Sequence, residues 1–317
     1  MHYFQESNLD NNKTYSAKNR ASKVRSAFQA RPFAEGASFR TFLDSLPHVF
    51  RADDLRNLAL AVIEAKEKQK PVIAMIGGHV IKTGCTPVLI DLARNGFITH
   101  FASNGSVAIH DTEMAWFGHT SEEVCSQLET GMFGMAHDTA EFVNKAAKCA
   151  ADNKTGFGTA LGFLQKEAEF PYIDRGLIAS CYGLGIPFTL HVALGTDIVH
   201  QHASADGAAI GQASLRDFRI LISSVADLGG GGVVVNLGSA VIMPEVFLKC
   251  LAVARNQRDD VRDFTTANFD MIQHYRPHAN VLHRPVSLGG QAFAITGHHE
   301  IMIPMLAAAI KEYAVSK

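Results

Sequence analysis

Short apolar runs alternate with amphipathic segments over most of the chain. Residues 71–76 are apolar throughout and end at Gly77-Gly78, which is typical of a buried strand that stops at a glycine turn. Thr86 then opens a helix with proline at its first position, Gly96 closes it, and a second strand is expected over residues 97–102. Because strand, turn, helix and strand follow within about 30 residues, the pattern predicts a βαβ unit and a parallel sheet.

The same alternation continues toward the C-terminus. Further strands are expected at residues 187–192, 233–236, 263–267 and 292–295. Helices are expected from Asp53 as an N-cap, and at residues 136–151, 159–170, 172–184, 215–228, 244–254 and 299–315. The pattern predicts an α/β fold with a doubly wound, mostly parallel sheet of about six strands flanked by helices. We expect an N-terminal arm and extension over residues 1–50 and a single α/β domain over 51–317, with a helical insertion at about 121–184.

Composition narrows the class of protein. The chain has 317 residues, 47% of them hydrophobic, which is enough for a large core. A net charge of −2 provides no basic field for nucleic acid or an anionic membrane surface, so neither is an expected partner. The five cysteines are dispersed and form no C-x-x-C pair, which favours a reducing, cytoplasmic compartment. No run of about 18 residues is both free of charge and apolar enough to be assigned as a membrane span.

Glycine and small polar residues follow the predicted strands directly. In an open parallel sheet, ligands bind beyond the carboxyl ends of the strands. The cofactor-binding residues expected there are Gly78, His79, Lys82, Thr83, Ser103, Asn104, Gly105, Gly238, Ser239, Thr266, Asp270, Gly297 and His298. Glycines admit a ligand close to the backbone, and helix N-termini offer N–H groups to phosphate. Any one such loop is typical of an ordinary turn. Their convergence at one edge predicts a crevice for a dinucleotide such as NAD, although the G-x-G-x-x-G spacing is absent.

Several histidines and one aspartate in these loops are candidates for chemistry. The histidines near predicted strand ends are His79, His110, His191, His200, His202, His298 and His299. A transition metal could use imidazoles, but no H-E-x-x-H motif occurs, so hydrogen bonding or acid–base roles are favoured and no metal site is predicted. The predicted catalytic residues are Asp197, for substrate contact, and His191 or His200, as a proton carrier.

The order of these loops resembles that of the deoxyhypusine synthase family, over roughly residues 71–314. Residues 78–84 resemble the family segment S-N-x-x-S-S-G, and residues 102–106 resemble the segment T-T-A-G-G. Residues 186–188, followed by 197–199, resemble the segment I-P-V-F followed by G-D-M-I. Residues 237–240 stand where the family has L-G-G-G, and residues 265–270 resemble the segment N-T-A-Q-E-F-D. The resemblance implies an NAD-binding α/β fold, a polyamine-type substrate, a transferase-like activity and a homo-oligomer, either a dimer or a tetramer.

The chain departs from the family at the residue that its reaction requires. In the family, an aminobutyl group is carried as an imine on a lysine between the F-D segment and the last strand. This chain has no lysine between Lys249 and Lys311, and neither His nor Arg replaces an imine-forming amine. Lys82 is the one lysine in a predicted edge loop; binding of cofactor pyrophosphate or simple solvation is favoured over a relocated amine. Deoxyhypusine synthase activity itself is therefore not expected.

Three functions are consistent with these observations. The leading hypothesis is a deoxyhypusine synthase-like, NAD-dependent transferase or oxidoreductase that acts on a small amine or amino acid without a lysine imine. Asp270 and His298 are then expected at the substrate or the nicotinamide ribose. The first alternative is an NAD-dependent enzyme of the ornithine cyclodeaminase type. The second is a non-catalytic nucleotide-binding or scaffold protein.

Overall fold

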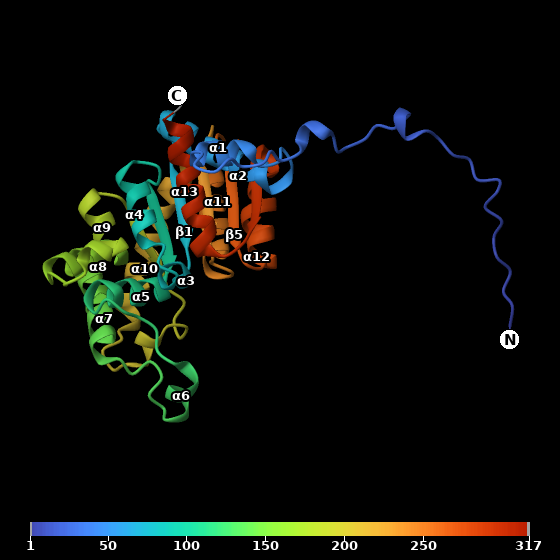
Figure 1. The fold of residues 1–317 in the computed structure, drawn as a ribbon. Coiled ribbons are helices and arrows are strands. Elements are labelled where there is room, and N and C mark those ends of the chain that lie inside the picture. Colours follow the sequence, from blue (N-terminus) through green and yellow to red (C-terminus); the bar gives the residue numbers. More distant parts are fainter. Residues whose placement is uncertain (1, 316–317) are drawn as a thin grey trace.

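A six-stranded parallel sheet forms the centre of the computed structural model, which describes residues 2–315 (Figure 1). The strands are β1 (Val72–Ile76), β2 (His100–Asn104), β3 (Phe188–His191), β4 (Val233–Leu237), β5 (Phe264–Asp270) and β6 (Gly290–Thr296). They lie in the order β3-β2-β1-β4-β5-β6, and every neighbouring pair is parallel. The predicted α/β fold with about six parallel strands is confirmed.

Helices cover both faces of this sheet. The α-helices are α1 (Phe39–Ser45), α2 (Phe50–Glu67), α3 (Gly78–Lys82), α4 (Thr86–Arg94), α5 (Gly105–Trp116), α6 (Val124–Glu129), α7 (His137–Asp152), α8 (Phe157–Glu167), α9 (Leu177–Leu184), α10 (Gly207–Ala226), α11 (Ile242–Gln257), α12 (Tyr275–Pro277) and α13 (His299–Ala314). The 3-10 turns are η1 (Ala17–Asn19), η2 (Ser26–Phe28), η3 (Ile173–Arg175), η4 (Ile198–Gln201) and η6 (Pro285–Leu288), and η5 (His278–His283) is a π-helix. None of the helices within residues 2–315 is long and apolar enough to cross a membrane.

Side chains of β1 show how the two faces are divided. Ala74 and Ile76 belong to an apolar cluster with α2, α4, α5, α9 and α13, whereas Ile73 and Met75 belong to a second cluster with α10 and α11. Successive side chains of a strand point to opposite faces, and here both faces are covered. The strand therefore reads as an unbroken apolar run.

Some element boundaries differ from the prediction. Strand β2 begins at His100, which pairs with Ile73, and not at residue 97. Phe97 and Ile98 are apolar because they are buried in the core before the first paired residue. As a result, Ser103 and Asn104 belong to the strand and do not follow it.

Two helices also begin elsewhere than expected. Helix α2 begins at Phe50, so Asp53 is not its N-cap but lies in the first turn, where its carboxylate accepts a hydrogen bond from Arg56 (2.5 Å). Helix α10 begins at Gly207, because the Asp206 side chain accepts two backbone N–H bonds there and caps it well before residue 215.

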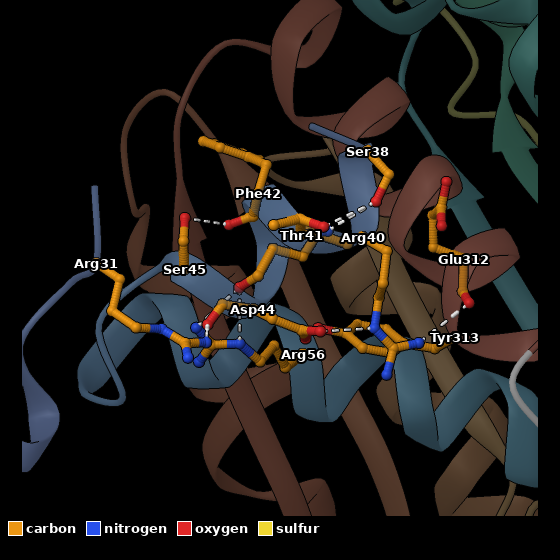
Figure 2. Close-up of polar contacts among 11 residues, drawn as sticks. Arg31, Ser38, Arg40, Thr41, Phe42, Asp44, Ser45, Arg56, Glu312 and Tyr313 are labelled. Atoms are coloured by element: carbon orange, nitrogen blue, oxygen red, sulfur yellow. Dashed lines mark hydrogen bonds and ion pairs between the residues drawn. The ribbon is translucent and has the colours of Figure 1, made fainter. Parts of the chain in front are cut away.

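The N-terminal segment runs away from the rest of the molecule and becomes attached only near α1 (Figure 1). Figure 2 shows the polar contacts that attach it: Arg31 donates to the carbonyl of Asp44 (2.7 Å), and Arg40 forms an ion pair with the Asp44 carboxylate (2.9 Å). The hydroxyl of Tyr313 donates to the same carboxylate (3.2 Å), and the Arg40 guanidinium lies over the Tyr313 ring. Asp44 thus links the arm and α1 to the C-terminal helix α13.

The chain between β2 and β3 forms helices α5 to α9, which include the segment expected as a helical insertion. Helix α7 packs against α8 and α10, and α8 packs against α9. Asp111 of α5 accepts the backbone N–H bonds of Leu177 (2.7 Å) and Ile178 (3.1 Å), so α9 begins there and not at residue 172. This helical group extends beyond one end of the sheet, with α6 farthest out (Figure 1).

Candidate functional site

The carboxyl ends of the strands meet at one edge, where the chain order reverses between β1 and β4. Most of the residues predicted for the site lie at this edge, in two groups. One group lies beside the ends of β1, β2 and β3. The other lies beside the ends of β1, β4, β5 and β6.

The first group borders a cavity of about 430 Å³. Its polar lining residues are Lys82, Ser106, His110, Glu113, His119, Thr120, Ser121, Glu122, Asp138, Thr139, Thr196 and Asp197. Lys82, the last residue of α3, is the one lysine or arginine among them, and four of the others are carboxylates. The cavity therefore combines one cationic side chain with four carboxylates.

Helix α5 supplies the floor of this cavity. It begins at Gly105 directly after β2, and positions 106, 110 and 113 fall on one face of a helix. His110 Nδ1 lies 2.7 Å from Thr120 Oγ1, and Thr120 Oγ1 in turn donates to Glu113 Oε2 (2.5 Å). Thr139 donates to the other oxygen of Glu113 (2.9 Å). These contacts hold the imidazole at the cavity wall.

The electrostatic surroundings keep His110 neutral at physiological pH. Burial, and then the nearby Lys82 cation, lower the pKa of the His110 imidazole to about 4. Asp197, which also lines the cavity, shows the reverse effect, because burial raises the pKa of its carboxyl to about 6. The two groups are therefore both unprotonated near pH 7.

Asp197 is held at the start of α5. A Cβ on Gly105 would lie 2.0 Å from Asp197 Oδ2, so the carboxylate occupies space that only glycine leaves open. Asp197 also caps η4, where its side chain accepts the backbone N–H of His200. His200 Nδ1 accepts the N–H groups of Gly195 (3.1 Å) and Asp197 (3.3 Å). His200, predicted as a proton carrier, thus stabilises the loop that carries Asp197.

The second group lies at the predicted cofactor crevice, where backbones approach one another closely. Gly238, at φ +69°, lies against the ring of His299, where a Cβ would be 2.4 Å from Nε2. A Cβ on Gly77 would be 2.4 Å from the Gly238 carbonyl oxygen. The ring of His79 lies 6.0 Å from that of His299, whose Nδ1 is buried and has no hydrogen-bond partner among the described residues. Asp270 ends β5 beside them and is almost fully buried.

The remaining predicted residues of the crevice differ in exposure. His298 is exposed and lies 3.7 Å from the Glu300 carboxylate, and Gly297 precedes it at the end of β6. Ser239 is buried, and its Oγ accepts the N–H of Met243 at the start of α11 (3.2 Å). These positions border the edge without forming a dense polar cluster.

Other predicted residues serve the scaffold in the structure. Ser103 is fully buried in β2 and donates to the Ile76 carbonyl of β1 (3.0 Å). Thr266 is fully buried inside β5, and Thr83 Oγ1 donates back to the His79 carbonyl of its own helix (3.1 Å). Asn104 Oδ1 accepts a hydrogen bond from Ser106 (2.7 Å). Ser103 is buried because β2 extends to residue 104 and not, as predicted, only to residue 102, so that Ser103 lies in the strand and not in the loop after it.

His191 lies apart from Asp197 although only five positions separate them in sequence. Its ring bonds to Thr189 (3.0 Å) on the face of β3 toward α10, and it borders a separate groove between α10 and α11. Burial lowers the pKa of His191 to about 3. Since side chains alternate along a strand, His191 and the cavity lie on opposite sides of the sheet.

Glu113 and Thr120 were not anticipated from the sequence. The available signal was the spacing of Ser106, His110 and Glu113, which becomes meaningful once a helix is recognised directly after the β2 strand. Across residues 2–315, no three His, Cys, Asp or Glu side chains are grouped closely enough to hold a metal ion.

Comparisons with known proteins agree with this architecture. Residues 56–197 match the family described as arginine dihydrolase ArgZ-like, C-terminal, Rossmann fold. A conserved putative LOR/SDH protein from Methanococcus maripaludis S2 is 17% identical with a TM-score of 0.51, covering 84% of this chain and 71% of that one. The ternary complex of AgrE with ornithine and NAD+ is 14% identical with a TM-score of 0.53, covering 83% of this chain and 33% of AgrE.

A putative deoxyhypusine synthase from Entamoeba histolytica is 11% identical with a TM-score of 0.50, covering 89% of this chain and 96% of that one. The chain thus spans nearly the whole of that protein but about a third of AgrE. No curated protein matches the chain in sequence. At these identities the likenesses establish the fold alone, and they confirm the predicted deoxyhypusine synthase-like arrangement of strands and helices.

Proposed function

We propose that the chain is an NAD-dependent enzyme that acts on a small amino acid, with the substrate in the cavity beside α5 and the cofactor in the crevice around Gly238. The observation that carries the proposal is the cavity itself, which is lined by Lys82 and several carboxylates next to glycines at the sheet edge. A cationic side chain and carboxylates match the carboxylate and the ammonium groups of an amino acid.

The crevice residues fit a dinucleotide. Gly77 and Gly238 carry no side chains there, and helix α13, of 16 residues, begins at this edge with its N-terminus, which favours a phosphate. The unpartnered, buried Nδ1 of His299 and the Asp270 carboxylate provide polar atoms for a ribose or a carboxamide. A bound nicotinamide would supply the chemistry of reversible hydride transfer.

The start of α5 fits a phosphate poorly. The Asp197 carboxylate already lies against Gly105, and a second anion at the same helix terminus would be repelled. Gly105 and Asn104, expected at the cofactor, are therefore not assigned to it. Lys82 is instead assigned to the substrate carboxylate, because it lines the cavity and not the crevice.

Ornithine cyclodeamination is the second candidate reaction. It is favoured by the match of residues 56–197 to the ArgZ-like domain and by the presence of ornithine with NAD+ in the AgrE structure of the same fold. Both candidates begin with withdrawal of a hydride from a carbon that bears an amine, so they need the same residues at the cavity. They differ in whether the NADH that is formed is consumed again in the same reaction.

The test starts with binding. Thermal unfolding of the purified chain is measured with and without NAD+, and NAD+ at about 100 times its Kd should stabilise the fold by about 2.7 kcal/mol. Gly238→Ala should abolish this stabilisation, because its Cβ would collide with the ring of His299 and close the crevice. Absence of any NAD+ effect on the unaltered protein would refute the proposal.

Turnover is measured next, with ornithine and other small amino acids as substrates and with NADH and ammonia as readouts. Ammonia without net NADH indicates cyclodeamination, and net NADH indicates oxidation. Lys82→Ala should raise KM by about tenfold or more through loss of one charged contact. Lys166→Ala, an exposed lysine of α8 away from the cavity, is the matched control. Binding of NAD+ without turnover of any amine would refute the proposed activity and favour a non-catalytic nucleotide-binding protein.

A further inference from the structure

The hydrogen-bonded chain of His110, Thr120 and Glu113 goes beyond what substrate binding requires. His110 and Glu113 are largely buried, with 14% and 13% of their side chains exposed. Thr120 comes from the segment after α5 and bridges them, at 2.7 Å from His110 Nδ1 and 2.5 Å from Glu113 Oε2. Three polar side chains are thus arranged in series at the cavity wall.

The direction of these bonds fixes the tautomer of His110. A threonine hydroxyl has one hydrogen, and Thr120 donates it to Glu113. Glu113 accepts a second hydrogen bond from Thr139, as an ionised carboxylate does. The Thr120 oxygen must therefore accept from His110, so the proton of the neutral imidazole resides on Nδ1 and the lone pair on Nε2.

Nε2 is the end of the ring that is free to react. It makes no hydrogen bond to any described residue, and His110 borders the cavity. The adjacent Cδ2 atom lies 3.0 Å from the position of a Cβ on Gly78, the first residue of α3 after β1. Because β1 lies between the cavity side and the crevice side of the sheet edge, this end of the ring lies where an amino acid and a nicotinamide would meet.

We propose, on the basis of the proposed function, that His110 Nε2 is the base that removes the amine proton of the substrate, and that Thr120 and Glu113 position it. The substrate ammonium gives one N–H proton to Nε2, which leaves a lone pair on the amine nitrogen. That pair would form the C=N bond, and a nicotinamide held in the crevice would supply the acceptor for the C–H hydride. The imidazolium is stabilised through Thr120 by the Glu113 carboxylate until its proton returns to water.

Charge in the cavity couples this step to substrate binding. The ionisable side chains that line the cavity around His110 are Lys82, Glu113, His119, Glu122, Asp138 and Asp197. Burial and Lys82 keep the free imidazole unprotonated, and a substrate carboxylate paired with Lys82 would remove the cationic part of that effect. His110 thus gains proton affinity when the substrate is present. Asp197 is less suited to the role, because its carboxylate is committed to capping η4.

The tautomer is tested without any activity, by nitrogen and carbon NMR of the full-length protein with isotope-labelled histidine, assigned with His110→Gln. His110 should show the Nδ1–H form, unprotonated at pH 7. Thr120→Val should shift it toward a mixture with the Nε2–H form, because the acceptor for Nδ1–H is lost, and Thr120→Ser should restore the original signal. A wild-type Nε2–H tautomer, or a signal unaffected by Thr120→Val, would overturn the positioning role.

Kinetics then test the base. His110→Gln should lower kcat by about 10²- to 10⁴-fold with little change in KM, and Thr120→Val should lower kcat by a smaller factor that Thr120→Ser recovers. His137→Gln, an exposed histidine at the start of α7, is the matched control. Full activity of His110→Gln would refute the role of His110 as the base and leave the proposed function standing. Failure of the unaltered protein to bind NAD+ would refute the proposed function itself.

Discussion

Gly105→Ala is the most direct test of how the cavity is built. An alanine Cβ would lie 2.0 Å from Asp197 Oδ2 and 2.6 Å from Asp197 Cγ, whereas ordinary contact begins at 3.4 Å. The carboxylate must therefore move by more than an ångström. Overpacking of this kind costs about 1–3 kcal/mol, and the higher helix propensity of alanine returns about 0.5–1 kcal/mol. The expected net loss in the free energy of unfolding is about 1–2 kcal/mol.

The loss is measured by urea unfolding followed through the fluorescence of Trp116, the only tryptophan of the chain. Trp116 ends α5 and stacks on Phe117 and Phe170, both at 4.8 Å between ring centroids, so it reports on the helix that Gly105 begins. Gly211→Ala is the matched control, because this α10 glycine has nothing within 4 Å of an added Cβ. It should be neutral or stabilising by about 0.5–1 kcal/mol.

A double-mutant cycle isolates the contact. In an Asp197→Ala background the carboxylate is absent, so Gly105→Ala should stabilise the fold there by about 0.5–1 kcal/mol, and the coupling between the two sites should equal the overpacking cost of about 1–3 kcal/mol. Equal losses in the two backgrounds would show that the strain lies elsewhere in the β2–α5 turn. No loss in either background would refute the placement of Asp197 over Gly105.

Two further predictions concern buried aspartates. Asp217 accepts hydrogen bonds from the backbone N–H groups of Gly158 (3.0 Å) and Leu190 (2.8 Å). Asp217→Ala leaves these two buried donors unpaired, so it should lower the free energy of unfolding in urea by about 2–5 kcal/mol. A loss below about 1 kcal/mol would contradict this prediction. Burial raises the pKa of Asp111 to about 6, above the 3.8 of the unfolded chain, so the folded protein binds this proton more tightly. The resulting stabilisation is complete below about pH 4 and is lost as the pH rises through 6. Asp111→Asn should therefore remove a decline of about 3 kcal/mol between these pH values, and an unchanged pH dependence would argue against the effect.

The strands and most helices could be predicted because their signals are local. A strand buried on both faces is an uninterrupted apolar run, as in residues 72–76, and glycines mark where the chain must turn. The parallel order follows from the alternation of strands and helices. These features place the ends of all six strands at one edge, and they were sufficient to indicate that edge as the candidate site.

Local sequence patterns could not show which side chains at this edge of the sheet face the cavity and which face the opposite groove. Whether a side chain faces the cavity or the opposite groove depends on the exact residue at which a strand begins, since a shift of one position reverses every side chain. His191 and Asp197 are close in sequence, yet they lie on different sides of the sheet. Ser103 moved from the loop into the core for the same reason.

Sequence alone therefore determined that this protein has a doubly wound α/β fold with ligand-type loops at one edge of the sheet. Only the tertiary structure decided which of these loops meet. The contact of Asp197 with Gly105 joins segments about 90 residues apart, and the bonds of Thr120 with His110 and Glu113 depend on how the chain turns back after α5. Such contacts are set by packing of whole elements, which leaves no periodic trace in the sequence.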